Sequence, residues 1–237
     1  MHALGNTRSR HCSDHLLQTP DTFVRAPWPG MTNATAIIHT APAVGARFVQ
    51  YTAEFEPQGE LAAAAVQRFV YVLEGEVVAN RQTLGPGGYA YLPPTESRIT
   101  SADGSRVAVI EKPYQPLAGT AAPAAFHGLE ANVAPQPLMG DADLEVRSLI
   151  PADPAFDFAV NTMTFAPGAT LPMVEIHVME HGLLFLAGGG IYRLGDHWYP
   201  VTAGDFIYMA PYCPQWFGAL GKSPAKYLIY KDWNRLA

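Results

Sequence analysis

Cysteine, charge and long apolar runs are scarce in this sequence, and each shortage excludes a class of protein. The 237 residues contain two cysteines, Cys12 and Cys213, which are too few and too far apart for a disulfide framework. No run of about 18 or more apolar residues could span a membrane, and residues 1–15 lack the apolar stretch of a signal peptide. These shortages predict a cytoplasmic protein that has no membrane partner.

Basic residues are also few, which bears on the partners the protein could have. The formal net charge is -6, the isoelectric point is near 5.7, and no basic patch stands out, so we expect no nucleic-acid partner. Charged residues make up 15% of the chain and hydrophobic residues 49%, which favours a sizeable core over disorder. We therefore expect a folded protein that acts on a small molecule.

Glycine and proline, in contrast, are abundant. With 21 of each and no collagen-like period, they indicate many short strands joined by turns. Apolar and polar residues alternate in FVYVLEGEV (69–77) and in DFIYMAP (205–211), and no long window has a helical period. The fold class predicted is all-β.

The chain also repeats itself. Residues 45–114 and 158–231 share one order of features, in which an apolar strand, a glycine turn, further strands and a proline corner follow one another. Arg68–Gly75 and His181–Gly188 have the same internal spacing and are offset by 113 residues, as the printed numbering shows. The repeat predicts two tandem antiparallel β-barrels of similar topology.

Four regions follow from this organisation. We expect an N-terminal arm over residues 1–44, an N-terminal barrel over 45–117, a Pro- and Ala-rich linker over 118–155, and a C-terminal barrel over 156–237.

Chemistry concentrates in the second repeat, where Glu175, His177 and His181 offer a carboxylate and two imidazoles for a divalent metal. In a strand, residues two apart point to one face about 6.6 Å from each other, so Glu175 and His177 can share an ion. His181 would lie roughly 13 Å beyond His177 on an unbroken strand. We therefore expect a turn over 178–180, which returns His181 on the next strand, and Gln215 on a third strand.

A helix is the competing interpretation, because His177 and His181 also have the i, i+4 spacing of helical zinc sites. A helix would leave Glu175 off the shared face. The β-branched residues Val174 and Ile176 favour a strand instead.

These motifs resemble those of the cupin superfamily. The matching positions are Gly168, Glu175, His177, His181 and Gly188 in the first motif, and Gly204, Pro211 and Gln215 in the second. The sequence departs from the commonest cupin pattern: Glu175 stands in place of the first His, His181 in place of the Glu, and Gln215 in place of the last His. This permuted set is similar to that of the bicupin (S)-ureidoglycine aminohydrolases, a resemblance that extends over essentially the whole chain.

The resemblance implies the fold, the reaction and the cofactor. It implies a bicupin of the double-stranded β-helix, or jelly-roll, type, and a hydrolase of C–N bonds in the linear amidine class. Such an enzyme releases ammonia from (S)-ureidoglycine and gives (S)-ureidoglycolate, in the allantoin pathway of purine catabolism. It further implies Mn²⁺ as the usual metal, with other divalent metals possible, Glu175, His177, His181 and Gln215 as its ligands, and a homo-oligomer.

Proton transfer needs groups beside the ion, and the candidates are Tyr192, Tyr227 and Lys231. Similar residues line the pocket of the family. Alternation predicts that Tyr227, Ile229 and Lys231 share one strand face. The sequence does not decide which of the three candidates gives or takes the proton.

The first repeat lacks these ligands. Alignment of Arg68 with His181 places Ala62 opposite Glu175, Ala64 opposite His177 and Arg98 opposite Gln215. Alanine cannot ligate a metal, so we expect one metal site per chain, in the C-terminal barrel.

Other interpretations stay open. An Fe²⁺ cupin dioxygenase acting on a small acid could use a similar set of ligands, and a bicupin without enzymatic activity could bind a small ligand. Taken singly, Gln215 could stabilise a turn, the two tyrosines could be core residues, and Lys231 could lie at the surface. His2, His11 and His15 could form a metal-binding tract, which terminal flexibility disfavours, whereas His197 is expected in solvent at a hairpin.

Overall fold

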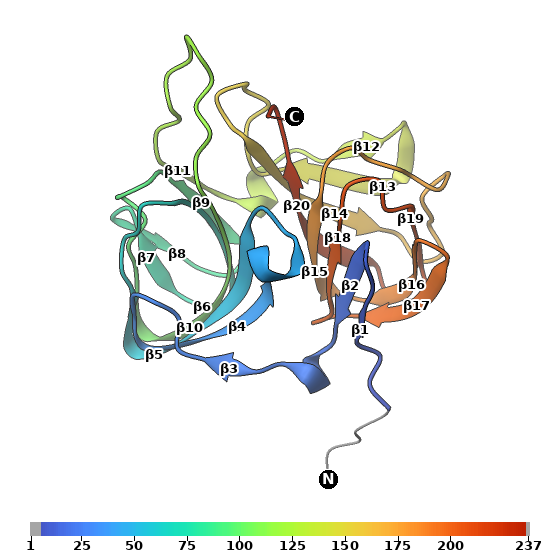
Figure 1. The fold of residues 1–237 in the computed structure, drawn as a ribbon, viewed down its shortest axis with the longest axis horizontal. Coiled ribbons are helices and arrows are strands. Elements are labelled where there is room, and N and C mark those ends of the chain that lie inside the picture. The colour runs from blue at the N-terminus through green and yellow to red at the C-terminus, as the bar shows by residue number, and fades with distance from the viewer. Residues whose placement is uncertain (1–5, 236–237) are drawn as a thin grey trace. The chain divides into compact units, whose positions relative to one another are not determined.

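A computed structural model describes residues 6–235 of the protein and builds them almost entirely from β-strands (Figure 1). The chain divides into two compact units. Among the described residues, the C-terminal unit contains 6–23, 134–151 and 158–235, and the N-terminal unit contains 24–133 and 152–157. Within the described residues, no helix is long and apolar enough to cross a membrane.

One antiparallel sheet forms most of the N-terminal unit. Its strands follow the order β11-β9-β6-β10-β5-β4-β3, and a β7–β8 hairpin pairs with β10. Their bounds are β3 (Arg25–Ala26), β4 (Met31–Thr40), β5 (Val49–Leu61), β6 (Gln67–Gly75), β7 (Val77–Ala79), β8 (Gln82–Leu84), β9 (Gly88–Leu92), β10 (Ile99–Lys112) and β11 (Phe126–Leu129). Short 3-10 turns occur at Pro42–Val44 and Glu130–Asn132.

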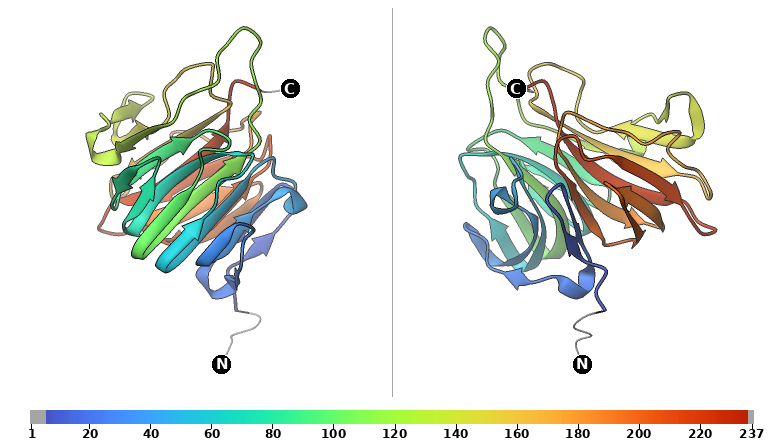
Figure 2. Two further views of the ribbon diagram at one scale, coloured as in Figure 1. Left: turned by 90° about the vertical axis from the view of Figure 1, so that its left-hand side faces the viewer. Right: turned by 45° about the vertical axis from the view of Figure 1, so that its right-hand side comes forward.

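Two sheets form the C-terminal unit, as Figure 2 shows from two further sides. The larger follows the order β1-β2-β18-β15-β20-β14-β13-β12, and the smaller follows β17-β16-β19. Their bounds are β1 (Arg10–His11), β2 (His15–Gln18), β12 (Gln136–Leu138), β13 (Asp141–Ser148), β14 (Phe158–Phe165), β15 (His181–Ala187), β16 (Gly189–Leu194), β17 (His197–Thr202), β18 (Phe206–Met209), β19 (Gln215–Ala219) and β20 (Ala225–Asp232). A 3-10 turn, Pro20–Thr22, follows β2.

The core of the C-terminal unit lies between its two sheets. Alternate residues of both sheets point inward, and Phe185 of β15, Phe217 of β19 and Tyr227 of β20 meet with ring centroids 5.5 to 5.9 Å apart. Each such buried aromatic side chain contributes about 1.5–3 kcal/mol through removal of apolar surface from water. The all-β jelly-roll prediction is confirmed. In the part of the chain that the structure describes, however, the strand orders are open, so the sheets do not close into complete barrels.

The chain is partitioned differently from the four regions expected from sequence. Residues of the expected arm divide between the units, because β1 and β2 pair with β18 whereas β3 and β4 extend the N-terminal sheet. Residues of the expected linker also form strands: β11 pairs with β9 and β13 pairs with β14. These added strands cover sheet edges that would otherwise present unpaired backbone groups.

The internal repeat appears as a repeated strand register. In the C-terminal unit His181 lies between Met209 of β18 and Lys231 of β20. In the N-terminal unit Arg68 lies between Leu92 of β9 and Glu111 of β10. Arg68 and His181 therefore occupy corresponding places, as the alignment of the two halves predicted.

Candidate metal centre

The ligand segment, residues 172–180, lies outside the named strands and is joined to β19 by a β-bridge. Glu175 pairs with Gln215: its N–H donates to the Gln215 carbonyl at 2.8 Å and its own carbonyl accepts from the Gln215 N–H at 2.9 Å. Glu175 and His177 are half-buried, whereas the alternating Val174 and Ile176 are exposed. The period of two that the sequence predicts is thus present, and a helix is not formed.

A bend at 178–179 turns the chain into β15, at the place predicted from the ligand spacing. His181 is the first residue of β15 and is buried, with a ring centroid 5.0 Å from that of His177. The His177 Nε2 atom lies 3.2 Å from Glu175 Oε2. The bend therefore brings a carboxylate and two imidazoles together from one short stretch of chain.

Gln215 follows the Pro211–Pro214 corner and opens β19, as expected. Its side chain is buried, and its Oε1 atom accepts a hydrogen bond from the Tyr192 hydroxyl at 3.0 Å. Tyr192 lies two residues from Leu194, which pairs directly with Gln215 across β16 and β19. The hydrogen bond from Tyr192 holds the Gln215 amide with its oxygen toward the phenol. That oxygen keeps a second lone pair, which a metal ion can use.

Lys231 lies directly opposite His181 across β15 and β20. With its amide oxygen toward Lys231, Asn161 of β14 accepts a hydrogen bond from Nζ at 3.1 Å, while its amide nitrogen donates to the Val160 carbonyl at 3.0 Å. Lys231 therefore points into the C-terminal unit and not toward solvent at the end of the strand.

Tyr227 lies on the same face of β20 as Lys231, with Ile229 between them, and all three point toward the core side as predicted. Tyr227 is almost completely buried against Phe165 and Phe185.

Burial dominates the electrostatics of these groups. Desolvation, with the nearby charges of Lys231 and His177, lowers the pKa of His181 well below its usual value. Desolvation also lowers the pKa of Lys231, against the opposing charge of Glu175. The pKa values of Tyr192 and Tyr227 are raised by burial and by Glu175, so both phenols stay protonated at neutral pH.

The donor chemistry of Glu175, His177, His181 and Gln215 fits a divalent first-row metal. A ligating histidine must be neutral, which the lowered pKa of His181 ensures, and carboxylate and amide oxygens complete a mixed nitrogen and oxygen set. One carboxylate leaves the combined ligand charge at minus one, so a bound ion would keep most of its positive charge.

The corresponding place in the N-terminal unit holds an ion pair. The Arg68 guanidinium is buried, donates to Glu111 Oε1 at 2.6 Å and to the Ala62 and Ser97 carbonyls at 2.5 Å, and Glu111 also accepts from the Tyr51 hydroxyl at 2.7 Å. The guanidinium fills its surroundings with hydrogen bonds to protein, so an ion pair stands where the C-terminal unit has its candidate ligands.

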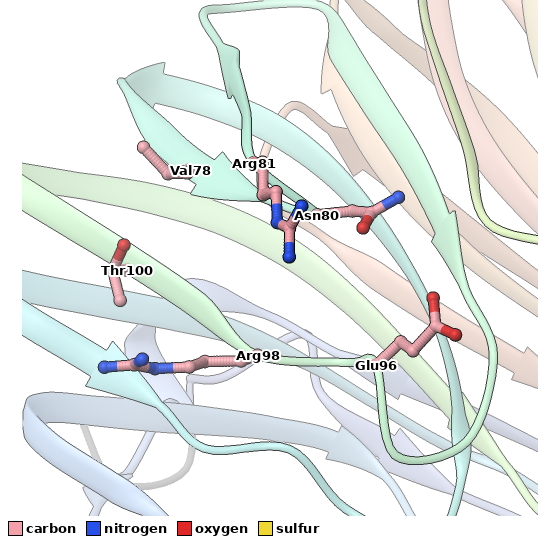
Figure 3. A pocket seen from close by; sticks show the side chains of 6 residues that line it. All are labelled: Val78, Asn80, Arg81, Glu96, Arg98 and Thr100. Atoms are coloured by element: carbon pink, nitrogen blue, oxygen red, sulfur yellow. The ribbon is translucent and has the colours of Figure 1, made fainter.

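A cleft of about 370 Å³ in the N-terminal unit offers little chemistry (Figure 3). Its lining residues are Val78, Asn80, Arg81, Glu96, Arg98 and Thr100. Arg98, which aligns with Gln215 in the repeat, forms a bidentate ion pair with Glu60 at 2.7 and 3.0 Å.

Two residues of the site were missed from sequence. Asn161 contacts Lys231 and Met209 lies opposite His181, with its sulfur 3.9 Å from the Tyr192 hydroxyl. The alternation in FAVNTMTF (158–165) could have placed Asn161 on an inward face, although nothing local indicates what it faces. Of the three histidines in the disfavoured N-terminal metal tract, His11 is exposed, His15 is buried, and His2 lies outside the described residues.

Comparison with known proteins adds evidence independent of this geometry. A family model described as "Cupin domain" matches residues 161–230. The chain is 40% identical over 245 residues to an Arabidopsis thaliana protein named (S)-ureidoglycine aminohydrolase, covering 98% of this chain and 80% of that protein. An Escherichia coli protein of the same name is 32% identical over 231 residues, covering 92% of this chain and 88% of that protein.

Solved structures agree. The crystal structure of the Escherichia coli protein Ylba has a TM-score of 0.83 at 31% identity, covering 98% of this chain and 96% of that chain. A putative glyoxylate-induced protein from Pseudomonas aeruginosa has a TM-score of 0.87 at 30% identity, covering 98% and 93%. Oxalate decarboxylase, at 11% identity and a TM-score of 0.70, shares the fold.

Proposed function

The chain belongs to the (S)-ureidoglycine aminohydrolase family, and we propose that its C-terminal unit hydrolyses (S)-ureidoglycine at a divalent metal centre. The products are (S)-ureidoglycolate and ammonia, in purine catabolism. The observation that carries this proposal is the pairing of Glu175 with Gln215, because it joins the two sequence motifs at the point where their ligands are needed.

The ligands we propose are Glu175, His177, His181 and Gln215, and the metal we propose is Mn²⁺, which accepts mixed nitrogen and oxygen ligands. When bound, the ion would supply positive charge that attracts and orients the carboxylate, amine or ureido oxygen of the substrate. The binding of two such groups would fix the face of the stereocentre that meets water.

Lys231 is the residue we propose for proton transfer. A lowered pKa increases the fraction of neutral amine at working pH, and the Asn161 oxygen holds Nζ at 3.1 Å. The neutral amine can accept a proton from the attacking water while the new C–O bond forms. It can return that proton to the departing nitrogen as the C–N bond breaks, so that no proton is left over.

The two phenols have different proposed roles. Tyr192 orients Gln215 through its hydroxyl, as the 3.0 Å hydrogen bond suggests. Tyr227, protonated and on the same strand face as Lys231, would donate a hydrogen bond to the substrate.

We further propose that the protein is a cytoplasmic homo-oligomer. Ile176 is 61% exposed, and Met173, Val174 and Val178 are exposed beside it on the ligand segment. Together they form an apolar surface that a second copy could cover. Light scattering of the purified protein tests this: a monomeric mass at micromolar concentration contradicts it.

The activity is tested with freshly generated (S)-ureidoglycine, with and without Mn²⁺, by following ammonia release and the chirality of the product. We expect release well above the spontaneous background and (S)-ureidoglycolate as product, without consumption of oxygen. No acceleration above background in the presence of Mn²⁺ would refute the proposal. Oxygen consumption with iron dependence would indicate a dioxygenase instead.

Two variants separate metal binding from proton transfer. Glu175→Ala should lose both bound metal and activity. Lys231→Met keeps the length of the side chain but no ionisable group, so it should retain metal and lose about 10²–10⁴-fold in kcat, the usual contribution of a positioned acid or base. If Lys231→Met keeps the wild-type kcat, Lys231 does not transfer the proton.

A further inference from the structure

A second cluster of metal-ligating side chains lies inside the C-terminal unit, and the proposed reaction does not use it. Ligand atoms of Cys12, His15 and His197 all lie within 4.8 Å of one another. His15 is buried, Cys12 is half-buried, and His197 is exposed, so the cluster opens to solvent on one side. Thiolate sulfur and imidazole nitrogen are both ligand types that zinc binds.

Two hairpins bring these residues together (Figure 1). The turn after β1 is closed by a hydrogen bond from the Cys12 N–H to the His15 carbonyl at 2.9 Å, and His15 then pairs with Met209 of β18. His197 opens β17 after the turn from β16 and pairs with Leu194. The His15 and His197 ring centroids are 5.7 Å apart. Residues far apart in sequence thus meet at a defined place.

Hydrogen bonds hold the ring of His15 in one orientation. Its Nδ1 atom lies 2.8 Å from Asp14 Oδ1, and its Nε2 atom lies 2.8 Å from the Tyr199 hydroxyl. With the Nδ1 proton donated to Asp14, Nε2 accepts a hydrogen bond from the Tyr199 hydroxyl, which a bound metal ion would replace. A carboxylate that orients a histidine in this way recurs behind the ligands of metal sites.

We propose that Cys12, His15 and His197 form a second metal site, which binds Zn²⁺ and fastens the β1–β2 hairpin to the β16–β17 hairpin. Tetrahedral zinc, with bonds of about 2.0 Å to nitrogen and 2.3 Å to sulfur, requires ligand atoms roughly 3.3–3.6 Å apart. The ligand atoms, now within 4.8 Å of one another, would have to approach further to bind the ion, and the exposed His197 is the one that solvent leaves room to move. The fourth position remains for water.

The cysteine distinguishes this site from the first. A thiolate favours Zn²⁺ and other soft or borderline ions over Mn²⁺, whereas the ligands around Glu175 contain no sulfur. The two sites are nevertheless linked in structure, because the Gly195 N–H, two residues before His197, donates to the Pro214 carbonyl at 2.8 Å. Zinc would therefore stabilise the turn that precedes Gln215 without touching the substrate.

The site is tested by Zn²⁺ titration of metal-free protein in a Glu175→Ala background, where the first centre is silenced. We expect one equivalent of bound Zn²⁺ and, with Co²⁺ in its place, a thiolate-to-cobalt charge-transfer band. Cys12→Ser and His197→Ala should each lose the equivalent and the band. Asp14→Asn should weaken Zn²⁺ binding about 10–100-fold. The matched control is His11→Ala, an exposed histidine of the same hairpin that should bind as the parent does.

Three outcomes would overturn the site. They are equal binding of Zn²⁺ by the wild-type and Cys12→Ser proteins, the absence of a thiolate band with Co²⁺, and a disulfide between Cys12 and Cys213 found by mass spectrometry. In the otherwise wild-type protein, Cys12→Ser should keep ammonia release with Mn²⁺ but lower the Tm in the presence of Zn²⁺. Because the Glu175→Ala titration does not depend on ureidoglycine hydrolysis, failure of the proposed function leaves it interpretable.

Discussion

Substitution of Tyr192 by Phe removes one hydroxyl from the C-terminal unit and leaves the ring that packs in its core. The lost atom donates to Gln215 Oε1 at 3.0 Å, so the Gln215 amide loses the contact that fixes its orientation. Removal of an outer hydrogen-bond partner from a metal ligand usually lowers metal affinity about 10–100-fold, or about 1.4–2.7 kcal/mol. We expect a loss of Mn²⁺ affinity in that range, with about 1 kcal/mol lost from folding stability.

Calorimetric titration of metal-free protein with Mn²⁺ measures this loss directly. Tyr227→Phe is the matched control, since it removes another buried hydroxyl from the same core and should leave the Mn²⁺ affinity unchanged. In a Gln215→Ala background, Tyr192→Phe should have no further effect on affinity, because its target is gone. Wild-type Mn²⁺ affinity in Tyr192→Phe would refute the argument that Tyr192 acts through a ligating Gln215.

Three further predictions concern folding. Glu111→Ala leaves the buried Arg68 without its carboxylate and should lower the free energy of unfolding, measured with denaturant, by about 3–5 kcal/mol. Glu60→Ala breaks a surface pair and should cost far less; equal losses in the two variants would contradict this. Burial lowers the pKa of His39 to about 3, so below about pH 6.5 the unfolded chain binds a proton that the folded chain does not. Stability should then fall by up to about 1.4 kcal/mol per pH unit between about pH 6.5 and 3, and His39→Asn should flatten that slope in acid titrations followed by circular dichroism. Gly188→Ala should lower the Tm, because Gly188 has a φ of +64° and an added Cβ would meet backbone; an unchanged Tm would contradict the turn geometry.

Local rules explain which parts of the site were accessible from sequence. Glu175 and His177 share a face because side chains alternate along any extended chain, and the separation of His181 demanded a turn whatever the surroundings. The burial of Lys231 could not be inferred in this way. It depends on β14, whose Asn161 lies about seventy residues earlier in the printed numbering and faces Lys231 only because β14 pairs with β20.

The partition of the chain was the least predictable feature. Strands such as β2 and β11 are four residues long, which is too short for alternation to distinguish them from loop. Their pairing with β18 and β9 is decided by which sheet edges remain open after the rest of each unit has formed. The residues therefore read as arm and linker in sequence and become strands only in the folded protein.

The sequence by itself determined the all-β class, the repeat, the permuted ligand motif and its absence from the first half, because each depends on residue type and short-range spacing. Tertiary structure alone decided what surrounds them: the Tyr192 contact to Gln215, the ion pair of Arg68 with Glu111, and the meeting of Cys12 with His197. These contacts join residues from different strands, and their energies arise only when long-range pairing has excluded water from between them.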